Sequence, residues 1–509
     1  MNRPALASLL AAAILVFVAA SQAAPGELDP GFGKKGKVMT SFGDVAYANS
    51  VTLQPNGKVV AAGVVGKANG EIAFGLARYR KNGSLDRAFG SKGKVTTKID
   101  QAAAASAVAL AQNRKIFAAG TSIDGTHSQF ALVRYRKDGS LDGEFASAGI
   151  ARAAFAAKDA GAGALVLQPD GRLVVAGNAS ENHRAEIALA RFDEDGTLDP
   201  SFGSDGEVEF PIPNEEAASA TGVAIQSDDK IVVAGSTYRV DGDNLLPVDA
   251  VLARLNADGS LDQTFGTNGV VTRALGDGPQ GEFGDRADGV AIQQDGKILV
   301  AGRVFYGTYD FGVARYNTDG TPDPSFGGDG KVVNTFGRNR TSGANAIALR
   351  KDGRIVLAGY SGKTEAKPEF AVARYRPDGS RDRSFGRRGW RTTRVGPRAE
   401  ANALALQRNG KVVAAGVALD AKRDKDVFAL VRYLDTQPVC VVPNVKRESS
   451  IGAKLKIIYA HCALGRVHQA YSRKVEQGRV ISQRPKPGVR LPARSRVNLV
   501  FSKGRRHRR

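Results

Sequence analysis

The chain has 509 residues, a formal net charge of +21 at pH 7, five histidines and two cysteines. So few histidines and cysteines leave no cluster with the spacing of a metal site, and we expect neither a metal nor another cofactor. Beyond residue 23 no stretch reaches the roughly 20 apolar residues of a membrane-spanning helix, which excludes such a span from the mature chain.

Residues 1–23 have the pattern of a signal peptide. Arg3 precedes an apolar run over residues 5–20, and Ser-Gln-Ala at 21–23 supplies the small residues of a cleavage site. We expect cleavage after Ala23, and no cysteine follows that would carry a lipid anchor. The mature protein is therefore predicted to be extracellular or associated with the cell wall.

A repeat occurs seven times between Leu28 and Tyr433. Each copy has the form LD..FG...G, then an apolar run, then QPDG[KR]..VAG, then F.LARY..DGS. The copies are separated by 57, 56, 57, 63, 61 and 59 residues. The aspartates that open the copies are Asp29, Asp86, Asp142, Asp199, Asp262, Asp323 and Asp382. A period of this size indicates a repeat architecture.

Each copy holds four short apolar runs separated by turn residues. Asn-Gly or Asp-Gly, as at residues 56–57 and 352–353, lies between two runs and predicts a tight hairpin. The run after this turn is apolar at consecutive positions, so both faces of that strand must be covered. We predict an all-β, seven-bladed β-propeller of four-stranded blades over residues 24–436. The segment 37–40 would supply the missing outer strand of the seventh blade and so close the ring.

Every copy carries one arginine in its third strand. These residues are Arg78, Arg134, Arg191, Arg254, Arg315, Arg374 and Arg432. They could form a ring of cations that binds an anion, or each could be a buried charge between blades that pairs with the aspartate of the LD motif. We favour the second interpretation, because a residue repeated sevenfold answers a packing need repeated sevenfold.

The symmetry of the repeat breaks in a few places, where function is expected. Residues 236–247 and 275–288 are longer than their counterparts and are either binding loops or tolerated insertions. Asp193, Asp195 and Asp199 have the spacing of an oxygen-ligand calcium loop. Other copies lack the first aspartate, so a plain turn is the favoured interpretation of these three residues.

The C-terminal residues 437–509 carry 18 Lys and Arg against two Glu, a local balance of +16. Few aromatic residues lie nearby for base stacking, so an anionic wall polymer or surface glycan is favoured over nucleic acid; a merely solvated basic tail, 505–509, is the alternative. The candidate wall- or anion-binding residues are Arg479, Arg484, Lys486, Arg490, Arg494 and Arg496. Both cysteines, Cys440 and Cys462, lie here, and an exported chain permits a disulfide between them. His461 and His468 are interpreted as surface residues.

Two resemblances follow from these motifs. The repeat resembles the delta-sixty repeat family of bacterial propeller-like proteins over about 400 residues. Residues 437–504 resemble a PASTA domain through VPNV at 442–445, GAK at 452–454, GRVISQRPKPG at 478–488 and VNLVFSKG at 497–504. This resemblance implies a small α+β domain of one helix on about three strands, stapled by Cys440–Cys462, and binding to peptidoglycan fragments.

These observations together predict an exported, non-catalytic scaffold. The PASTA-like module would hold it at the wall, and the propeller, expected to be monomeric, would offer a surface to an unknown protein or glycan. The propeller has only His127 and His183 and no G.S.G elbow, which argues against an enzyme. Glycosidase chemistry needs only two carboxylates, so a secreted glycan-active enzyme is one alternative. A free extracellular adhesion protein is the other.

Overall fold

The computed structural model describes residues 24–506 except 157, 183, 242–243, 277–283, 338, 365, 436–439, 461 and 492–494. The predicted signal peptide, His183, His461, Arg494 and the last three residues of the basic tail lie outside the described residues. The chain divides into two compact units, one over residues 25–436 and the other from residue 437 onward. We describe each unit by itself.

The first unit is built from strands alone in the part that the structure describes. Their bounds are β1 (Lys37–Thr40), β2 (Val45–Leu53), β3 (Val59–Gly66), β4 (Ile72–Tyr79), β5 (Lys94–Thr97), β6 (Ala102–Leu110), β7 (Ile116–Ile123), β8 (Ser128–Tyr135), β9 (Ile150–Ala153), β10 (Asp159–Leu167), β11 (Leu173–Glu181), β12 (Arg184–Phe192), β13 (Glu207–Phe210), β14 (Ala217–Ile225), β15 (Ile231–Asp241), β16 (Asn244–Leu255), β17 (Val270–Thr272), β18 (Arg286–Ile292), β19 (Ile298–Phe305), β20 (Tyr309–Tyr316), β21 (Lys331–Asn334), β22 (Thr341–Leu349), β23 (Ile355–Gly362), β24 (Glu369–Tyr375), β25 (Trp390–Thr393), β26 (Ala399–Leu406), β27 (Val412–Asp420) and β28 (Lys425–Tyr433).

The strands pair in antiparallel groups of four, which we call blades 1 to 7. They are β2–β5, β6–β9, β10–β13, β14–β17, β18–β21, β22–β25, and β26–β28 together with β1. A single parallel residue pair, Ala185 with Ala217, links blades 3 and 4 into one eight-stranded sheet. As predicted, β1 adds to the last blade, pairing with β28 from Lys37–Val431 to Thr40–Phe428.

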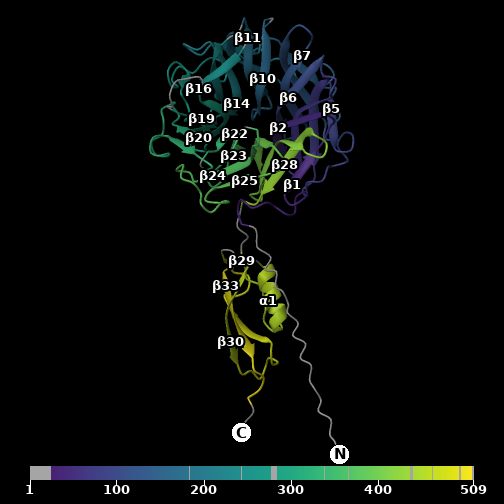
Figure 1. Cartoon of the computed structure of the whole chain (residues 1–509), viewed down its shortest axis with the longest axis vertical. Coiled ribbons are helices and arrows are strands. Elements are labelled where there is room, and N and C mark those ends of the chain that lie inside the picture. The colour runs from purple at the N-terminus through teal and green to yellow at the C-terminus, as the bar shows by residue number, and fades with distance from the viewer. Residues whose placement is uncertain are drawn as a thin grey trace, which may run out of the picture. The chain divides into compact units, whose positions relative to one another are not determined.

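The blades stand around an axis (Figure 1). Their first strands contact one another in the order β2, β6, β10, β14, β18, β22 and β26, and β26 contacts β2 again. Apolar side chains of neighbouring blades fill the space between them; one such cluster joins Phe32, Ala61 and Phe428 across blades 1 and 7. The predicted all-β propeller fold is confirmed.

Positive backbone φ angles at the hairpin turns explain the Asn-Gly and Asp-Gly pairs. Gly57 and Gly353 have φ of +80° and +77°, values that glycine adopts without strain. Two copies lack this glycine, yet Arg114 and Asp229 take φ of +68° and +61° at the same place. The hairpin turn therefore keeps its backbone conformation in the two copies that lack glycine.

The second unit is a small α+β domain, as predicted. Its elements are β29 (Cys440–Val441), α1 (Ser450–Tyr459), β30 (Ala463–Ala470), β31 (Val480–Arg484), β32 (Arg490–Leu491) and β33 (Arg496–Ser502). The main sheet has the order β30-β33-β31, and β29 pairs with β32. Helix α1 begins after Ser449, whose hydroxyl accepts a hydrogen bond from the Gly452 N–H, and it buries Ala453 and Ile457. The predicted disulfide Cys440–Cys462 joins β29 to the segment after α1.

Within the described residues no helix is long and apolar enough to cross a membrane.

Candidate functional site

Each repeated arginine forms an ion pair with the LD aspartate. The nitrogen–oxygen distances in the seven pairs lie between 2.7 and 2.9 Å, and the arginine side chains are 3–9% exposed. Each guanidinium also lies 4.4–4.8 Å from the centroid of the phenylalanine ring of the same FG motif. A third contact reaches the next blade: Arg134 Nη1 donates to the Glu194 carbonyl at 2.6 Å. The arginines thus lie within the packing between blades.

A second cation on each aspartate was missed by the sequence reasoning. The basic residue directly after the hairpin turn lies 2.6–2.9 Å from the same carboxylate in all seven blades. These residues are Lys58, Lys115, Arg172, Lys230, Lys297, Arg354 and Lys411. Burial disfavours the ionised form of Asp86, but the hydrogen bond from Lys58 and the charge of Arg78 outweigh burial and hold its pKa below the usual range. The sequence signal for this second cation was the Lys or Arg that directly follows the hairpin turn in each copy.

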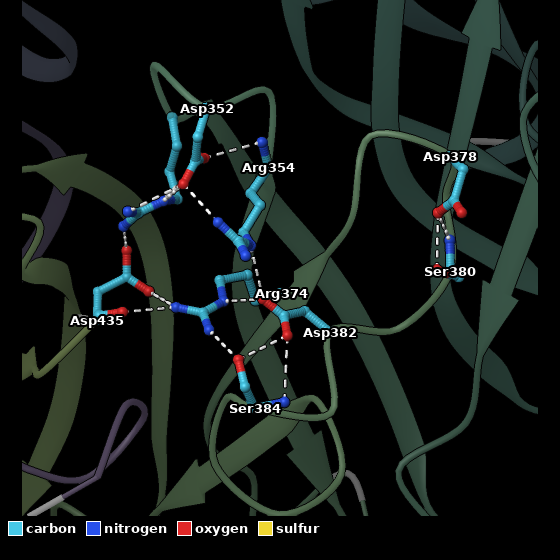
Figure 2. Close-up of polar contacts among 9 residues, drawn as sticks. Asp352, Arg354, Arg374, Asp378, Ser380, Asp382, Ser384 and Asp435 are labelled. Carbon is cyan, nitrogen blue, oxygen red and sulfur yellow. Dashed lines mark hydrogen bonds and ion pairs between the residues drawn. The ribbon is translucent and has the colours of Figure 1, made fainter. Parts of the chain in front are cut away.

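Blade 6 extends this network (Figure 2). Asp382 accepts from Arg374 and contacts Arg354 at 2.9 Å each, and the Ser384 hydroxyl donates to it at 2.7 Å. Asp435, fully buried at the end of the first unit, forms ion pairs with Arg374 and with Arg350. Burial lowers the pKa of Arg374 to about 10, although Asp382 opposes the shift.

Arg350 and Asp435 both depart from the repeat. Five of the other copies have glutamine where Arg350 stands, and the residues that match Asp435 are Lys81, Lys137, Glu194, Ala257, Thr318 and Pro377. Arg350 of blade 6 and Asp435, which follows blade 7, form an ion pair with each other. The two departures from the repeat therefore complement one another.

The three aspartates of the calcium-like motif are engaged by other groups. Asp195 Oδ1 accepts from the N–H and hydroxyl of Thr197 at 2.9 and 2.7 Å. Asp199 pairs with Arg191 and Arg172, and Asp193 lies 3.7 Å from Arg172. Among the described residues no group of three or more His, Cys, Asp or Glu is arranged to hold a metal ion. The geometry is that of a turn with charged neighbours.

The two long segments lie together in blades 4 and 5. Residues 236–247, expected to be a loop, mostly extend the β15–β16 hairpin, with Tyr238 opposite Pro247 and Val240 opposite Leu245; this expectation was wrong because the insertion continues the strand ladder. Part of the second segment, 277–283, lies outside the described residues. After residue 283 the segment is attached to the β15–β16 hairpin, since the Gly284 N–H donates to the Pro247 carbonyl at 2.9 Å.

All seven first strands line a central channel with a cavity volume of about 630 Å³. Each first strand has a β-bulge at the same point. The bulge residues are Asn49, Ser106, Gly163, Thr221, Asp288, Asn345 and Asn402. Several of them bond to the next blade: the amide of Asn49 donates to the Ala105 carbonyl at 2.9 Å, and that of Asn402 to the Ala48 carbonyl at 3.1 Å.

A groove in the second unit has a volume of about 720 Å³. Helix α1 contributes Ser450 and Lys454, and β30 contributes Leu464, Val467 and Gln469. Tyr471, Phe501 and Lys503 also line it. Tyr471 is 57% exposed, and the cationic ends of Lys503 and Arg506 lie 5.7 and 6.0 Å from the centroid of its ring. The groove thus combines apolar, aromatic and cationic groups.

The predicted wall-binding cations lie elsewhere on this unit. Arg479, Arg484, Lys486, Arg490 and Arg496 are all exposed, and none of them lines the groove. Arg479 pairs with Glu476 at 2.7 Å and donates to the Arg447 carbonyl at 3.0 Å. The sequence reasoning followed charge, and so it missed the groove, whose distinguishing residue is Tyr471.

Comparison with known protein families agrees with both units. A domain of unknown function described as a β-propeller, DUF5122, matches six segments: 54–89, 111–145, 168–202, 226–265, 293–326 and 350–385. The PASTA domain matches residues 441–503. The chain is therefore a repeat β-propeller protein. More particularly, it carries DUF5122 propeller repeats followed by a PASTA domain, as the two resemblances implied.

Three solved structures similar to the chain are remote in sequence. Polysaccharide lyase Uly1 is 10% identical with a TM-score of 0.43, covering 76% of this chain and 90% of its own. A protein of unknown function from Dyadobacter fermentans is 13% identical with a TM-score of 0.41, covering 80% and 100%. Sqt1 from Chaetomium thermophilum, bound to the N-terminus of a ribosomal protein, is 11% identical with a TM-score of 0.40, covering 78% and 100%. No curated protein matches the sequence significantly.

Proposed function

We propose that the protein is an exported, non-catalytic binding protein that its PASTA domain retains at the cell wall, where the propeller presents a ligand-binding surface. The PASTA match over residues 441–503, together with the groove between α1 and β30, is the observation that carries this proposal. Propeller repeats and a PASTA domain in one chain fit a wall-associated protein.

The groove offers the chemistry that a wall fragment requires. Leu464 and Val467 provide apolar contact, and the exposed Tyr471 ring offers a flat face to a sugar or a peptide stem. Lys454 and Lys503 can pair with the carboxylates of the stem. We therefore propose that retention depends on the groove more than on the exposed cations from Arg479 to Arg496.

Sedimentation of the full chain with purified peptidoglycan, over a salt series, tests this proposal. Tyr471→Ala and the double variant Lys454→Ala/Lys503→Ala should each weaken retention about tenfold, which corresponds to roughly 1.4 kcal/mol. Lys486→Ala/Arg490→Ala removes the same charge outside the groove and is the matched control, expected to retain nearly full binding. Equal losses in the two double variants, vanishing with salt, would instead show plain charge attraction.

Two further outcomes separate the alternatives. A free adhesion protein predicts no sedimentation with peptidoglycan even at low salt. A glycan-active enzyme predicts new reducing ends in the polymer after incubation, whereas a binding protein leaves the polymer intact. N-terminal sequencing of the protein recovered outside the cell tests the proposed export signal, with Ala24 expected as the first residue.

A further inference from the structure

One layer of residues beside the central channel breaks the sevenfold symmetry, and Arg286 is the member of it that lines the cavity. It consists of the residue two positions before each bulge and the residue paired with it on the second strand. Around the ring the pairs are Tyr47–Val64, Ala104–Thr121, Gly161–Asn178, Ser219–Ser236, Arg286–Arg303, Gly343–Tyr360 and Glu400–Val417. Blades 2 to 4 have only small, uncharged side chains in this layer. Blades 5 to 7 place two arginines, a tyrosine and a glutamate there, next to Asp288, the single charged bulge residue.

Arg303 is held in place within this layer. Its Nε lies 3.5 Å from Asp288 Oδ2, and its guanidinium carbon lies 5.6 Å from the Tyr360 ring centroid and 6.0 Å from that of Tyr309. A Cβ on Gly343 would come within 2.8 Å of the Tyr360 ring, so glycine at this place is what admits the ring. Arg303 and its partners are thus a packed support with little freedom to move.

Arg286 differs from Arg303 in that it lines the channel. Its Nη2 is 3.8 Å from Asp288 Oδ1, a carboxylate already shared with Arg303, and its side chain is 31% exposed. The buried Nε of Arg286 has no hydrogen-bond partner within the described structure. Among the residues that the structure describes, Asp288 is the carboxylate paired with Arg286, and it is shared with a second arginine, so the guanidinium favours an anionic ligand.

The remaining channel lining fits a ligand rich in hydroxyl groups. Ser106 contributes a hydroxyl, and Thr221, whose hydroxyl donates to the Ala287 carbonyl, contributes an acceptor oxygen. The amides of Asn49, Asn345 and Asn402 each give one N–H to the next blade and keep a second N–H for a ligand. The volume of about 630 Å³ lies within the range of roughly 300–1,000 Å³ that is typical of small-molecule sites. Few aromatic faces line it, which disfavours a nucleobase.

We propose that the channel binds an acidic saccharide, whose carboxylate pairs with Arg286 and whose hydroxyls bond to the amides and hydroxyls of the bulge ring. Asp288 is the positioning residue of Arg286, and Arg303, packed against Tyr360, holds Asp288 in turn. This inference rests on the proposed role of the propeller as a binding surface, and it is independent of wall retention by the PASTA domain. A sugar that carries both a carboxylate and hydroxyls occurs in uronic-acid polymers and in the muramic acid of wall glycans.

Calorimetric titration of the full chain tests the inference, with trigalacturonate and an N-acetylmuramic-acid disaccharide as probes and cellotriose as the neutral control. One molecule of an acidic probe should bind per chain, and the probe that binds identifies the source. Arg286→Gln should weaken binding at least tenfold, and Arg286→Lys should restore part of it. Arg398→Gln, which removes an exposed arginine paired with Asp426, is the matched control and should bind as the unaltered chain does.

The outcomes are separable from those of the wall experiment. Absence of binding by both acidic probes, equal binding of cellotriose, or full binding by Arg286→Gln would each overturn the inference. If Arg286→Gln lowers the melting temperature, Ser106→Trp, which fills the channel from blade 2, replaces it and should abolish binding; retained binding would contradict the site. Tyr471→Ala should leave the titration unchanged, and Arg286→Gln should leave sedimentation with peptidoglycan unchanged.

Discussion

Arg432 on β28 forms an ion pair with Asp29, 403 residues earlier in the chain, with Nε 2.8 Å from Oδ2. In the other blades the same pair spans only eight residues, as between Arg78 and Asp86. The ring is therefore closed by the same local interaction that each blade makes internally, reinforced by the pairing of β1 with β28. The N-terminal segment 28–40 belongs physically to the last blade.

Deletion of residues 28–42 should open the ring at blade 7. The Asp29–Arg432 pair and the β1 strand are lost together, which leaves Arg432 without its carboxylate and the outer edge of β28 unpaired. We expect faster hydrogen–deuterium exchange of the amides from Phe428 to Val431 and a lower melting temperature. Deletion of the basic residues 505–509, outside the propeller, is the control. Unchanged protection of β28 would contradict the account of closure.

The LD aspartates should make the stability of the propeller depend on pH in the acid range. The seven LD aspartates all have pKa values lowered, despite burial, by their cationic partners, and in blades 3 to 6 also by a Ser or Thr hydroxyl. Groups with a depressed native pKa contribute stability above their unfolded pKa of about 3.9, and lose it as the pH falls through the lower native values. The melting temperature of the propeller should be nearly flat from about pH 5 to 8 and fall steeply below about pH 4. A constant melting temperature down to pH 3 would show that the pairs contribute little.

Arg350 and Asp435 should be energetically coupled. Asp435→Asn and Arg350→Gln each leave a buried partner with one contact fewer, and each should destabilise the chain by about 2–4 kcal/mol. The double variant restores the residue type found at the Arg350 position in other copies, and should lose about 1–3 kcal/mol less than the sum of the two. Urea unfolding midpoints measure this cycle. Strict additivity would mean that the two departures from the repeat are unrelated.

The fold could be predicted from the sequence because every copy repeats the same local signals. Glycine at positive φ after Asn56 and Asp352 specified the hairpins, and the apolar runs after them specified strands covered on both faces. Pairing of the arginines with the LD aspartates followed from the same repetition. The second cation, such as Lys58, was overlooked because a residue after a turn is usually solvated.

The candidate sites could be predicted far less well. The layer that contains Arg286, Arg303 and Tyr360 depends on the register between two strands, and single residues scattered over 75 positions give no motif. In the PASTA domain the many Lys and Arg residues led to the prediction of a binding surface made of exposed cations. Tyr471 and the apolar side chains of β30 form a groove only when α1 and the sheet are in place.

Hydrogen–deuterium exchange of the full chain, with and without a purified muropeptide, tests the proposed function most directly. The account predicts new protection over residues 450–454, 464–471 and 501–503, which line the groove, and its absence in the Tyr471→Ala variant. Protection confined to the exposed cations between residues 479 and 490, or no protection in the PASTA domain at all, would contradict it.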